Sequence, residues 1–202
     1  METKLTEQES LQMITQMIHQ AQNNFKKGAG NLMIFWGYVV AFASLSVFVL
    51  SFFIGNLANL VWFIFIPTWI ITFFMIQKTD RSAIVKTHID QIYKSIWIAF
   101  AISNAILQFV FWAVYYYFDV TLQFTMMTPI VLILTGAAQF ISGKVYRFQP
   151  YIYGGYIFWL GAIVCFLILP KVQYHFLVLA ISMVFGYIIP GMKLNKKAEE
   201  NV

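Results

Sequence analysis

The sequence is poor in charge. Only 10% of its 202 residues are charged, whereas a soluble globular domain carries about 25%. Hydrophobic residues make up 60% of the chain, against roughly 45 to 50% in soluble proteins. This composition excludes an ordinary soluble domain and indicates an integral membrane protein.

Charge is also missing from the long apolar runs themselves. All eight acidic and all thirteen basic residues fall outside six apolar segments. Proton relays, ion-coupled carriers and voltage sensors place ionisable groups inside the membrane, despite the cost, because their mechanisms need them there. The lack of such groups disfavours these classes. It equally disfavours an intramembrane aspartyl protease, which needs two carboxylates.

Motifs for catalysis and metal binding are lacking as well. The chain has no HExxH, no GxSxG and no glycine-rich phosphate loop. We expect His19 and His88 on one side of the membrane and His175 on the other, so the histidines cannot converge on one metal ion. The only cysteine, Cys165, cannot form an intrachain disulfide. We predict no catalytic residue, no metal site and no cofactor, and the dispersed basic residues predict no nucleic-acid partner.

Six apolar runs are long enough to cross a bilayer. A hydrocarbon core about 30 Å thick needs about 20 mostly apolar residues per helix. Continuous runs, unlike alternating ten-residue segments, favour helices over a barrel. The predicted transmembrane helices cover residues 32–54, 57–76, 96–118, 122–141, 151–169 and 174–189. Pro67 falls inside the second of them and predicts a kink there.

Basic residues are distributed unevenly between the predicted connections. Every Lys and Arg except Lys171 would lie on the side of the two termini. Because short cytoplasmic loops are enriched in Lys and Arg, both termini should be cytoplasmic and the helices should form three outward hairpins. The outer connections are too short for a folded domain, and we expect the bacterial inner (cell) membrane as the location.

Two cytoplasmic segments, before the first and third predicted spans, are amphipathic. Apolar residues recur in them at helical spacing, and Thr6 and Glu9 of the first segment fit a capping box. The row of apolar residues on each segment can pack against another part of the chain, bind in the lipid headgroup region or dock a protein partner. The partner-docking candidates are Leu11, Ile14, Ile18, Phe25, Val85, Ile89 and Ile92.

The predicted fold class is therefore an all-α integral membrane protein of six helices with two cytoplasmic amphipathic helices. Residues 1–31 would form the first amphipathic helix and a glycine hinge, residues 32–189 the transmembrane domain, and residues 190–202 a basic cytoplasmic tail. The sequence shows no residue-level repeat that would support an inverted-repeat transporter.

Four polar side chains stand out within the apolar runs. Asn104 and Gln108 lie one turn apart in the third predicted helix, and Thr135 and Gln139 share a face of the fourth. Asn104 and Thr135 lie at similar depth, about 12 and 9 Å from the inner boundary at 1.5 Å per residue. The two pairs predict a hydrogen-bonded seam between these helices. The alternative is that they line a cytoplasm-facing cavity for a neutral or lipid-like ligand.

Three functions fit this sequence. The first is a non-catalytic accessory, anchoring or regulatory subunit that docks a cytoplasmic or membrane protein partner through its cytoplasmic helices. The second is a small channel or carrier for an uncharged or amphiphilic solute. The third is an interfacial enzyme acting on lipid, with candidate residues Asp80, His88, Asp90, Lys144 and Arg147. The lack of catalytic motifs favours the first, and the lipid bilayer is a partner in all three.

Overall fold

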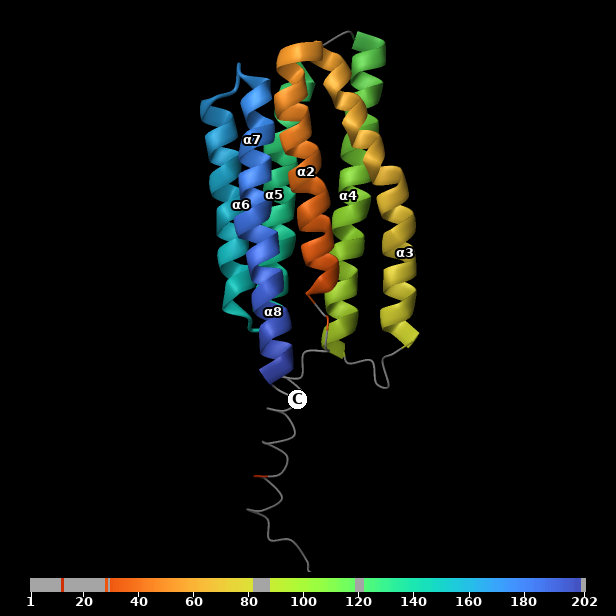
Figure 1. The fold of residues 1–202 in the computed structure, drawn as a ribbon, viewed down its shortest axis with the longest axis vertical. Coiled ribbons are helices and arrows are strands. Elements are labelled where there is room, and N and C mark those ends of the chain that lie inside the picture. Colours follow the sequence, from red (N-terminus) through yellow and green to blue (C-terminus); the bar gives the residue numbers. More distant parts are fainter. Residues whose placement is uncertain (1–11, 13–27, 29, 82–87, 119–121, 201–202) are drawn as a thin grey trace, which may run out of the picture.

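The computed structural model describes residues 12, 28, 30–81, 88–118 and 122–200, and these residues form helices joined by turns, with no strand among them (Figure 1). The elements are α2 (Asn31–Ile54), η1 (Gly55–Ile64), α3 (Phe65–Arg81), α4 (His88–Phe118), α5 (Leu122–Val145), α6 (Gln149–Leu167), α7 (Val172–Met183), η2 (Val184–Ile188) and α8 (Ile189–Glu200). The end of the bundle at which α8 terminates is called the lower end below.

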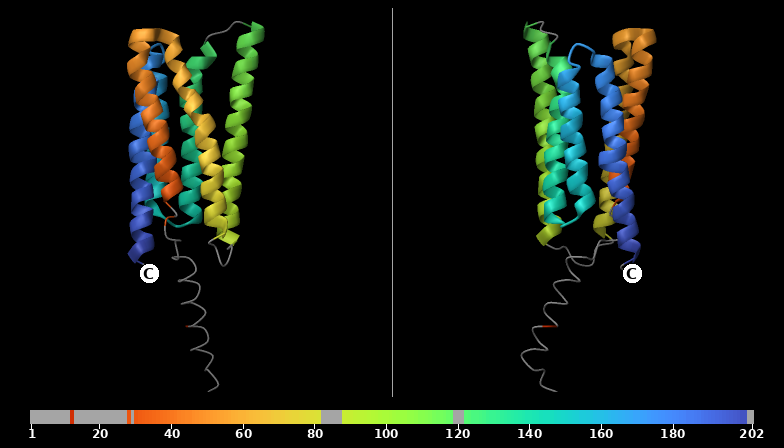
Figure 2. Two further views of the ribbon diagram at one scale, coloured as in Figure 1. Left: turned by 45° about the vertical axis from the view of Figure 1, so that its right-hand side comes forward. Right: turned by 90° about the vertical axis from the view of Figure 1, so that its left-hand side faces the viewer.

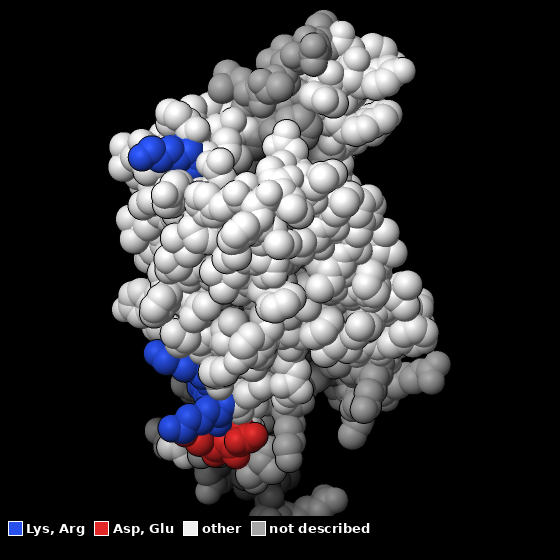
Figure 3. Space-filling view, turned by 45° about the horizontal axis from the view of Figure 1, so that its top comes forward, with Lys and Arg blue, Asp and Glu red and all other residues white. Residues whose placement is uncertain are grey.

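Five continuous helical stretches are long and apolar enough to cross a membrane. They are Asn31–Gln77, Gln91–Tyr117, Thr125–Val145, Gln149–Leu167 and Val172–Glu200. The predicted class, an all-α protein with several membrane-spanning helices, is confirmed at this level. Figure 3 shows one face of the molecule. Its coloured Lys, Arg and Glu side chains lie near the two ends of this face, and the described surface between them is uncharged.

The first of the five stretches doubles back at Gly55, so that α2 and α3 run in opposite directions (Figure 1). Gly55 has φ 57° and ψ −131°, a conformation that glycine adopts without the strain a Cβ would cause. The 3-10 helix η1 follows, and Pro67 lies in the first turn of α3. Pro67 therefore marks a change of helix type instead of kinking a continuous α-helix. Thr68 Oγ1, at the next residue, donates to the Ile64 carbonyl of η1 at 2.7 Å, so its hydroxyl is satisfied within the same helical stretch.

Two helical stretches extend beyond the predicted spans. Helix α4 begins in the second amphipathic segment and continues without a break through the third predicted span. Helix α7, η2 and α8 also form one stretch, so residues 190–200 of the predicted tail are helical. Asn195 of α8 donates to Asn31 Oδ1 at 2.6 Å, which joins this extension to the start of α2.

The core lies between α2, α5, α6 and the α7–η2–α8 stretch (Figure 2). Glycines allow α5 and α6 to approach closely. A Cβ built on Gly155 would lie 2.9 Å from the Gly136 carbonyl oxygen, so the two backbones are in direct contact. Tyr151, Phe158 and Leu132 are among the largest side chains fully buried in this core.

Helices α3 and α4 are peripheral. Helix α4 packs against α5, and none of its described side chains is fully buried. Helix α3 contacts η1 and α2, and within the described residues no Cα of α3 lies within 8 Å of a Cα of α4. Among the side chains of α3 whose burial is described, Thr68 and Thr72 are buried, while the isoleucine and phenylalanine side chains are largely exposed. The exposed face of α3 is thus apolar, and its buried face carries hydroxyl groups.

Candidate functional site

The last helical stretch changes to a π-helix at η2, in the lower half of the bundle. One-turn π segments are rare and are often found at functional sites. Gly186 lies in the middle of η2, and its carbonyl oxygen accepts a hydrogen bond from Gln139 Nε2 of α5 at 3.3 Å. The π turn therefore presents a backbone carbonyl oxygen to an amide side chain of α5 inside the core.

Gln139 is completely buried, with 0% of its surface exposed. Its Nε2 lies 3.9 Å from the sulfur of Met33 on α2. A Cβ added to Gly154 of α6 would lie 3.3 Å from the same nitrogen. The other end of the amide, Oε1, is buried and has no hydrogen-bond partner in the described structure. Leaving such an acceptor unpaired costs about 1–3 kcal/mol. Gln139 Oε1 can therefore accept a hydrogen bond from a bound molecule.

A buried donor also lies beside η2. Trp97 of α4 has its Nε1 buried, and its interaction with the Tyr93 hydroxyl of the same helix does not reach the geometry of a hydrogen bond. Its ring centroid lies 5.8 Å from that of Tyr187, the residue after Gly186. An unpaired donor on α4 and an unpaired acceptor on α5 therefore flank the same π turn.

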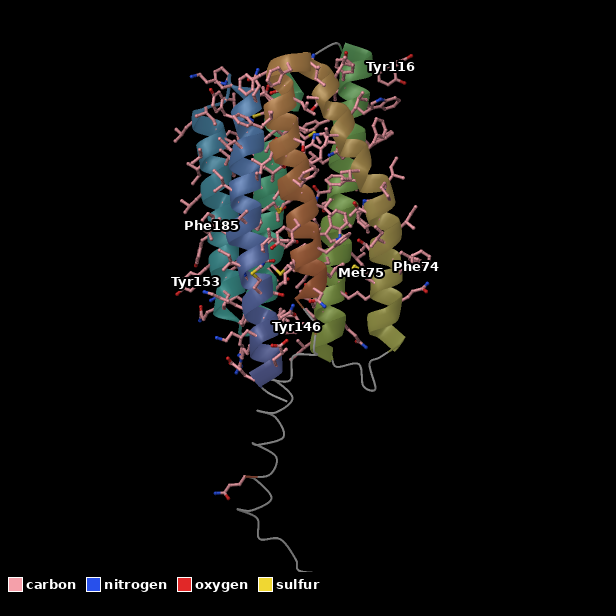
Figure 4. All side chains as sticks on the ribbon, in the orientation of Figure 1. Phe74, Met75, Tyr116, Tyr146, Tyr153 and Phe185 are labelled. Carbon is pink, nitrogen blue, oxygen red and sulfur yellow. The ribbon has the colours of Figure 1, made fainter. Side chains whose placement is uncertain are left out.

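Tyrosines from several elements surround this turn. Tyr93 of α4 packs on Tyr146 at a centroid distance of 5.0 Å, and Tyr146 lies at the lower end of the bundle (Figure 4). Tyr151 of α6 is 1% exposed. Tyr187 packs on Phe158 at 5.6 Å. Aromatic faces with hydroxyl groups at their edges can bind molecules that are partly apolar and partly polar.

The α2–α3 side adds two tryptophans and a buried hydroxyl. Trp36 packs on Trp69 at 5.2 Å between ring centroids. Thr72 Oγ1 is buried without a hydrogen-bond partner among the described residues. Thr72, Trp97 and Gln139 each lie about 8 to 9 Å from the lower end of their apolar stretch at 1.5 Å per residue. The three unpaired polar groups thus share one level of the bundle.

The candidate site is uncharged. No Asp, Glu, Lys or Arg side chain described by the structure is buried. Among the described residues, no three His, Cys, Asp or Glu side chains are grouped so that they could hold a metal ion. The site offers amide, indole and hydroxyl groups next to aromatic surfaces, which suits binding by neutral hydrogen bonds and apolar contact.

The four polar residues of the predicted seam have different environments. Asn104 is half-buried and donates to a carbonyl of its own helix at 2.9 Å. Thr135 is buried and also donates within its own helix, at 2.7 Å. Gln139 bonds to η2, and Gln108 is exposed. The hydrogen bonds that these side chains form in the described structure do not run between α4 and α5.

Most predicted docking residues are outside the described chain. Leu11, Ile14, Ile18, Phe25 and Val85 belong to this group, whereas Ile89 is half-buried and Ile92 is exposed on α4. The side chains of Asp80, His88 and Asp90, considered for an interfacial enzyme, also lie outside the described residues. Lys144 and Arg147 are described and exposed.

His175, expected from the sequence on the side of the membrane opposite His19 and His88, is buried. It is 0% exposed, and its ring lies close to backbone groups of Thr125, Cys165 and Ile168 without reaching the geometry of a hydrogen bond. The side chain lies near the start of α7, which packs against α5 and α6 as well as α2. It therefore lies at the upper end of the bundle, away from the Gln139 site.

The comparisons with known proteins assign no function to this site. No protein-family model matches the chain, and no curated protein or solved structure has significant similarity to it.

Proposed function

We propose that the protein crosses the membrane six times and acts as a small carrier or channel for an uncharged or amphiphilic molecule, which it binds at the Gln139 site. The stretch Asn31–Gln77 has 47 residues and would be about 70 Å long as one straight helix. This is twice what a bilayer requires, and the chain reverses at Gly55. Two crossings by this stretch and one by each of the other four make six.

The proposed orientation places the lower end in the cytoplasm of a bacterial cell. The basic residues Lys144, Arg147, Lys193, Lys196 and Lys197 belong to that end, whereas Lys171 follows α6 at the other. Short cytoplasmic loops carry the excess of Lys and Arg. The Gln139 site would then lie in the cytoplasmic half of the membrane.

The observation that carries the proposal is the pair of unpaired polar atoms beside η2, Gln139 Oε1 and Trp97 Nε1. A neutral group that both donates and accepts, such as a hydroxyl or an amide, matches an unpaired acceptor and an unpaired donor. A charged ligand would lose its hydration and find no buried counter-charge among the described residues. Ser44 Oγ, also buried and unpaired, lies about 20 Å from the start of α2 and extends the uncharged polar groups toward the middle of the membrane.

Retention of a bound molecule tests this proposal. Protein extracted with its surrounding lipid is analysed by mass spectrometry as wild type, Gln139→Leu and Gln173→Leu. Gln173 is exposed near the start of α7 and serves as the matched control. We expect one defined neutral molecule in the wild type and in Gln173→Leu, and at least a tenfold loss in Gln139→Leu, because leucine removes both hydrogen-bonding atoms of the amide.

The same molecule is then offered to proteoliposomes. Uptake by the wild type and loss of uptake in Gln139→Leu would support a carrier or channel. A wild-type protein that retains no defined molecule, or that retains it equally in Gln139→Leu, contradicts the proposed site.

The second candidate function is the accessory subunit, and the exposed Ile92 near the lower end of α4 favours it. Ile92 belongs to the row of apolar residues predicted on the second amphipathic segment, and an apolar helix face of this kind can dock another protein. We expect a partner, if this function holds, to copurify with the full chain at fixed stoichiometry and to be lost when residues 1–27 are deleted. A chain that purifies from crosslinked membranes without any other protein would exclude this role.

A further inference from the structure

One exposed face of α4 combines an amide, a small residue and two large aromatic rings. The face consists of Ala105, Gln108, Trp112 and Tyr116, spaced by three or four residues as the side chains of one helix face are. All four are exposed, Trp112 to 60% and Tyr116 to 71%. We call these four residues the Gln108 face.

Gln108 lies within the hydrocarbon layer. The apolar stretch Gln91–Tyr117 has 27 residues and is about 40 Å long, with Gln108 about 14 Å from its upper end. The hydrocarbon core is about 30 Å thick, so the amide is not at the headgroup level. The described structure records no hydrogen bond for Gln108, whereas Asn104, one turn below, donates to its own helix. Lipid offers the Gln108 amide no partner, and unpaired polar groups in lipid are costly.

The surroundings of Gln108 allow another helix to come close. Ala105, one turn below, has no side chain beyond Cβ, and small residues are what close helix contacts in membranes use. Trp112 and Tyr116 stack on each other at 5.8 Å with an interplanar angle of 18°. They form an ordered aromatic wall above the amide, and Tyr116 points away from the bundle in Figure 4.

We propose that the Gln108 face binds the same face of a second copy of this chain, so that the protein is a homodimer through α4. A primary amide has one donor group and one acceptor group. Across a two-fold axis, Nε2 of each Gln108 can therefore donate to Oε1 of the other, and both amides are satisfied by the same pair of contacts. Two copies inserted in the same orientation place Gln108 at equal depth, as this pairing requires.

The choice of a second copy over another protein follows from this self-complementarity. A different partner would need a polar side chain at the same depth, whereas a second copy provides it automatically. The face also carries no charge that would repel its own copy. This inference does not depend on ligand binding at the Gln139 site, because that site is formed by side chains packed against η2, whereas the four residues of the Gln108 face are exposed.

Disulfide crosslinking in native membranes tests the dimer. In a Cys165→Ala background, Ala105→Cys is compared with Ser103→Cys, a nearly isosteric change at an exposed residue two positions away. The two positions differ by about 160° around the helix. We expect an oxidised dimer of the chain from Ala105→Cys and at least tenfold less from Ser103→Cys. No dimer from Ala105→Cys, equal dimer from both, or a crosslink to a different protein overturns the proposal.

A second measurement addresses the amide itself. The monomer–dimer equilibrium is measured by energy transfer between labelled copies in vesicles as the lipid dilution is varied. We expect Gln108→Leu to lower the association constant about tenfold, the effect of losing two intramembrane hydrogen bonds. Gln108→Asn keeps both groups on a shorter side chain and should lower it less. An association constant unchanged by Gln108→Leu contradicts the pairing of the two amides.

Discussion

Gln139→Glu is expected to destabilise the protein by at least about 3 kcal/mol near neutral pH, the scale of placing a charge within a membrane helix. The side chain keeps its shape, but the amide is replaced by a carboxylate at a position with 0% exposure. No basic side chain that the structure describes is buried with it. The carboxylate would also face the Gly186 carbonyl oxygen, which now accepts from Nε2 at 3.3 Å. Thermal unfolding in detergent, followed by tryptophan fluorescence, measures the loss.

The pH dependence of this variant identifies the cause. A protonated carboxyl group is neutral and can donate to the Gly186 carbonyl as the amide does, so stability should be largely recovered near pH 5 and lost as the pH rises. Gln149→Glu is the matched control, because Gln149 is exposed at the first residue of α6, where a negative charge is favourable. Its melting temperature should stay within a few degrees of the wild type. Equal stability of Gln139→Glu and wild type would contradict a charge-free environment for Gln139.

The sequence predicted well those elements that hydropathy alone decides. The first predicted span ends at Ile54, as α2 does, and the fourth begins at Leu122, as α5 does. At both places an apolar run meets small or polar residues, and no distant contact is needed to set the boundary. The continuous α4 was predictable for the same reason, because apolar residues keep helical spacing from the amphipathic segment into the span.

The extent of the last helix was missed although the sequence carries a signal for it. Tyr187, Gly191, Leu194 and Ala198 follow one another by four, three and four residues, and all four are buried. This stripe continues the helix face beyond the apolar run. The prediction ended the span where hydropathy fell, whereas side-chain periodicity continued to Ala198.

The site could be predicted in its composition but not in its geometry. Gln139 was identified as an unusual polar residue in an apolar run, and an amide there does take part in a specific hydrogen bond. Its partner is the backbone of η2, which lies 47 residues further along the chain. A π turn has no local sequence signature that distinguishes it from α-helix. It depends here on close contact with α6, so only the packed bundle reveals which carbonyl the amide meets.

Gly154→Ala is expected to lower the stability by about 1–3 kcal/mol, as overpacking of a tight core does. A Cβ at Gly154 would lie 2.5 Å from the Gly186 carbonyl oxygen. That oxygen belongs to the backbone of η2, so it cannot move aside unless the π turn shifts. The melting temperature of the purified variant, compared with the wild type, measures the effect.

Gly161→Ala on the same helix separates this cause from a general effect of alanine in α6. Its Cβ would also come within 2.5 Å of an oxygen, but that oxygen is the Ser182 hydroxyl, which can rotate away. We expect Gly161→Ala to lower the stability less than Gly154→Ala does. The double variant Gly161→Ala, Ser182→Ala should lose no more stability than Ser182→Ala alone. Only Gly154→Ala should also reduce retention of the bound molecule, because it displaces the carbonyl that orients Gln139. Equal losses of stability and retention in both glycine variants would mean that η2 is not the rigid support of the site.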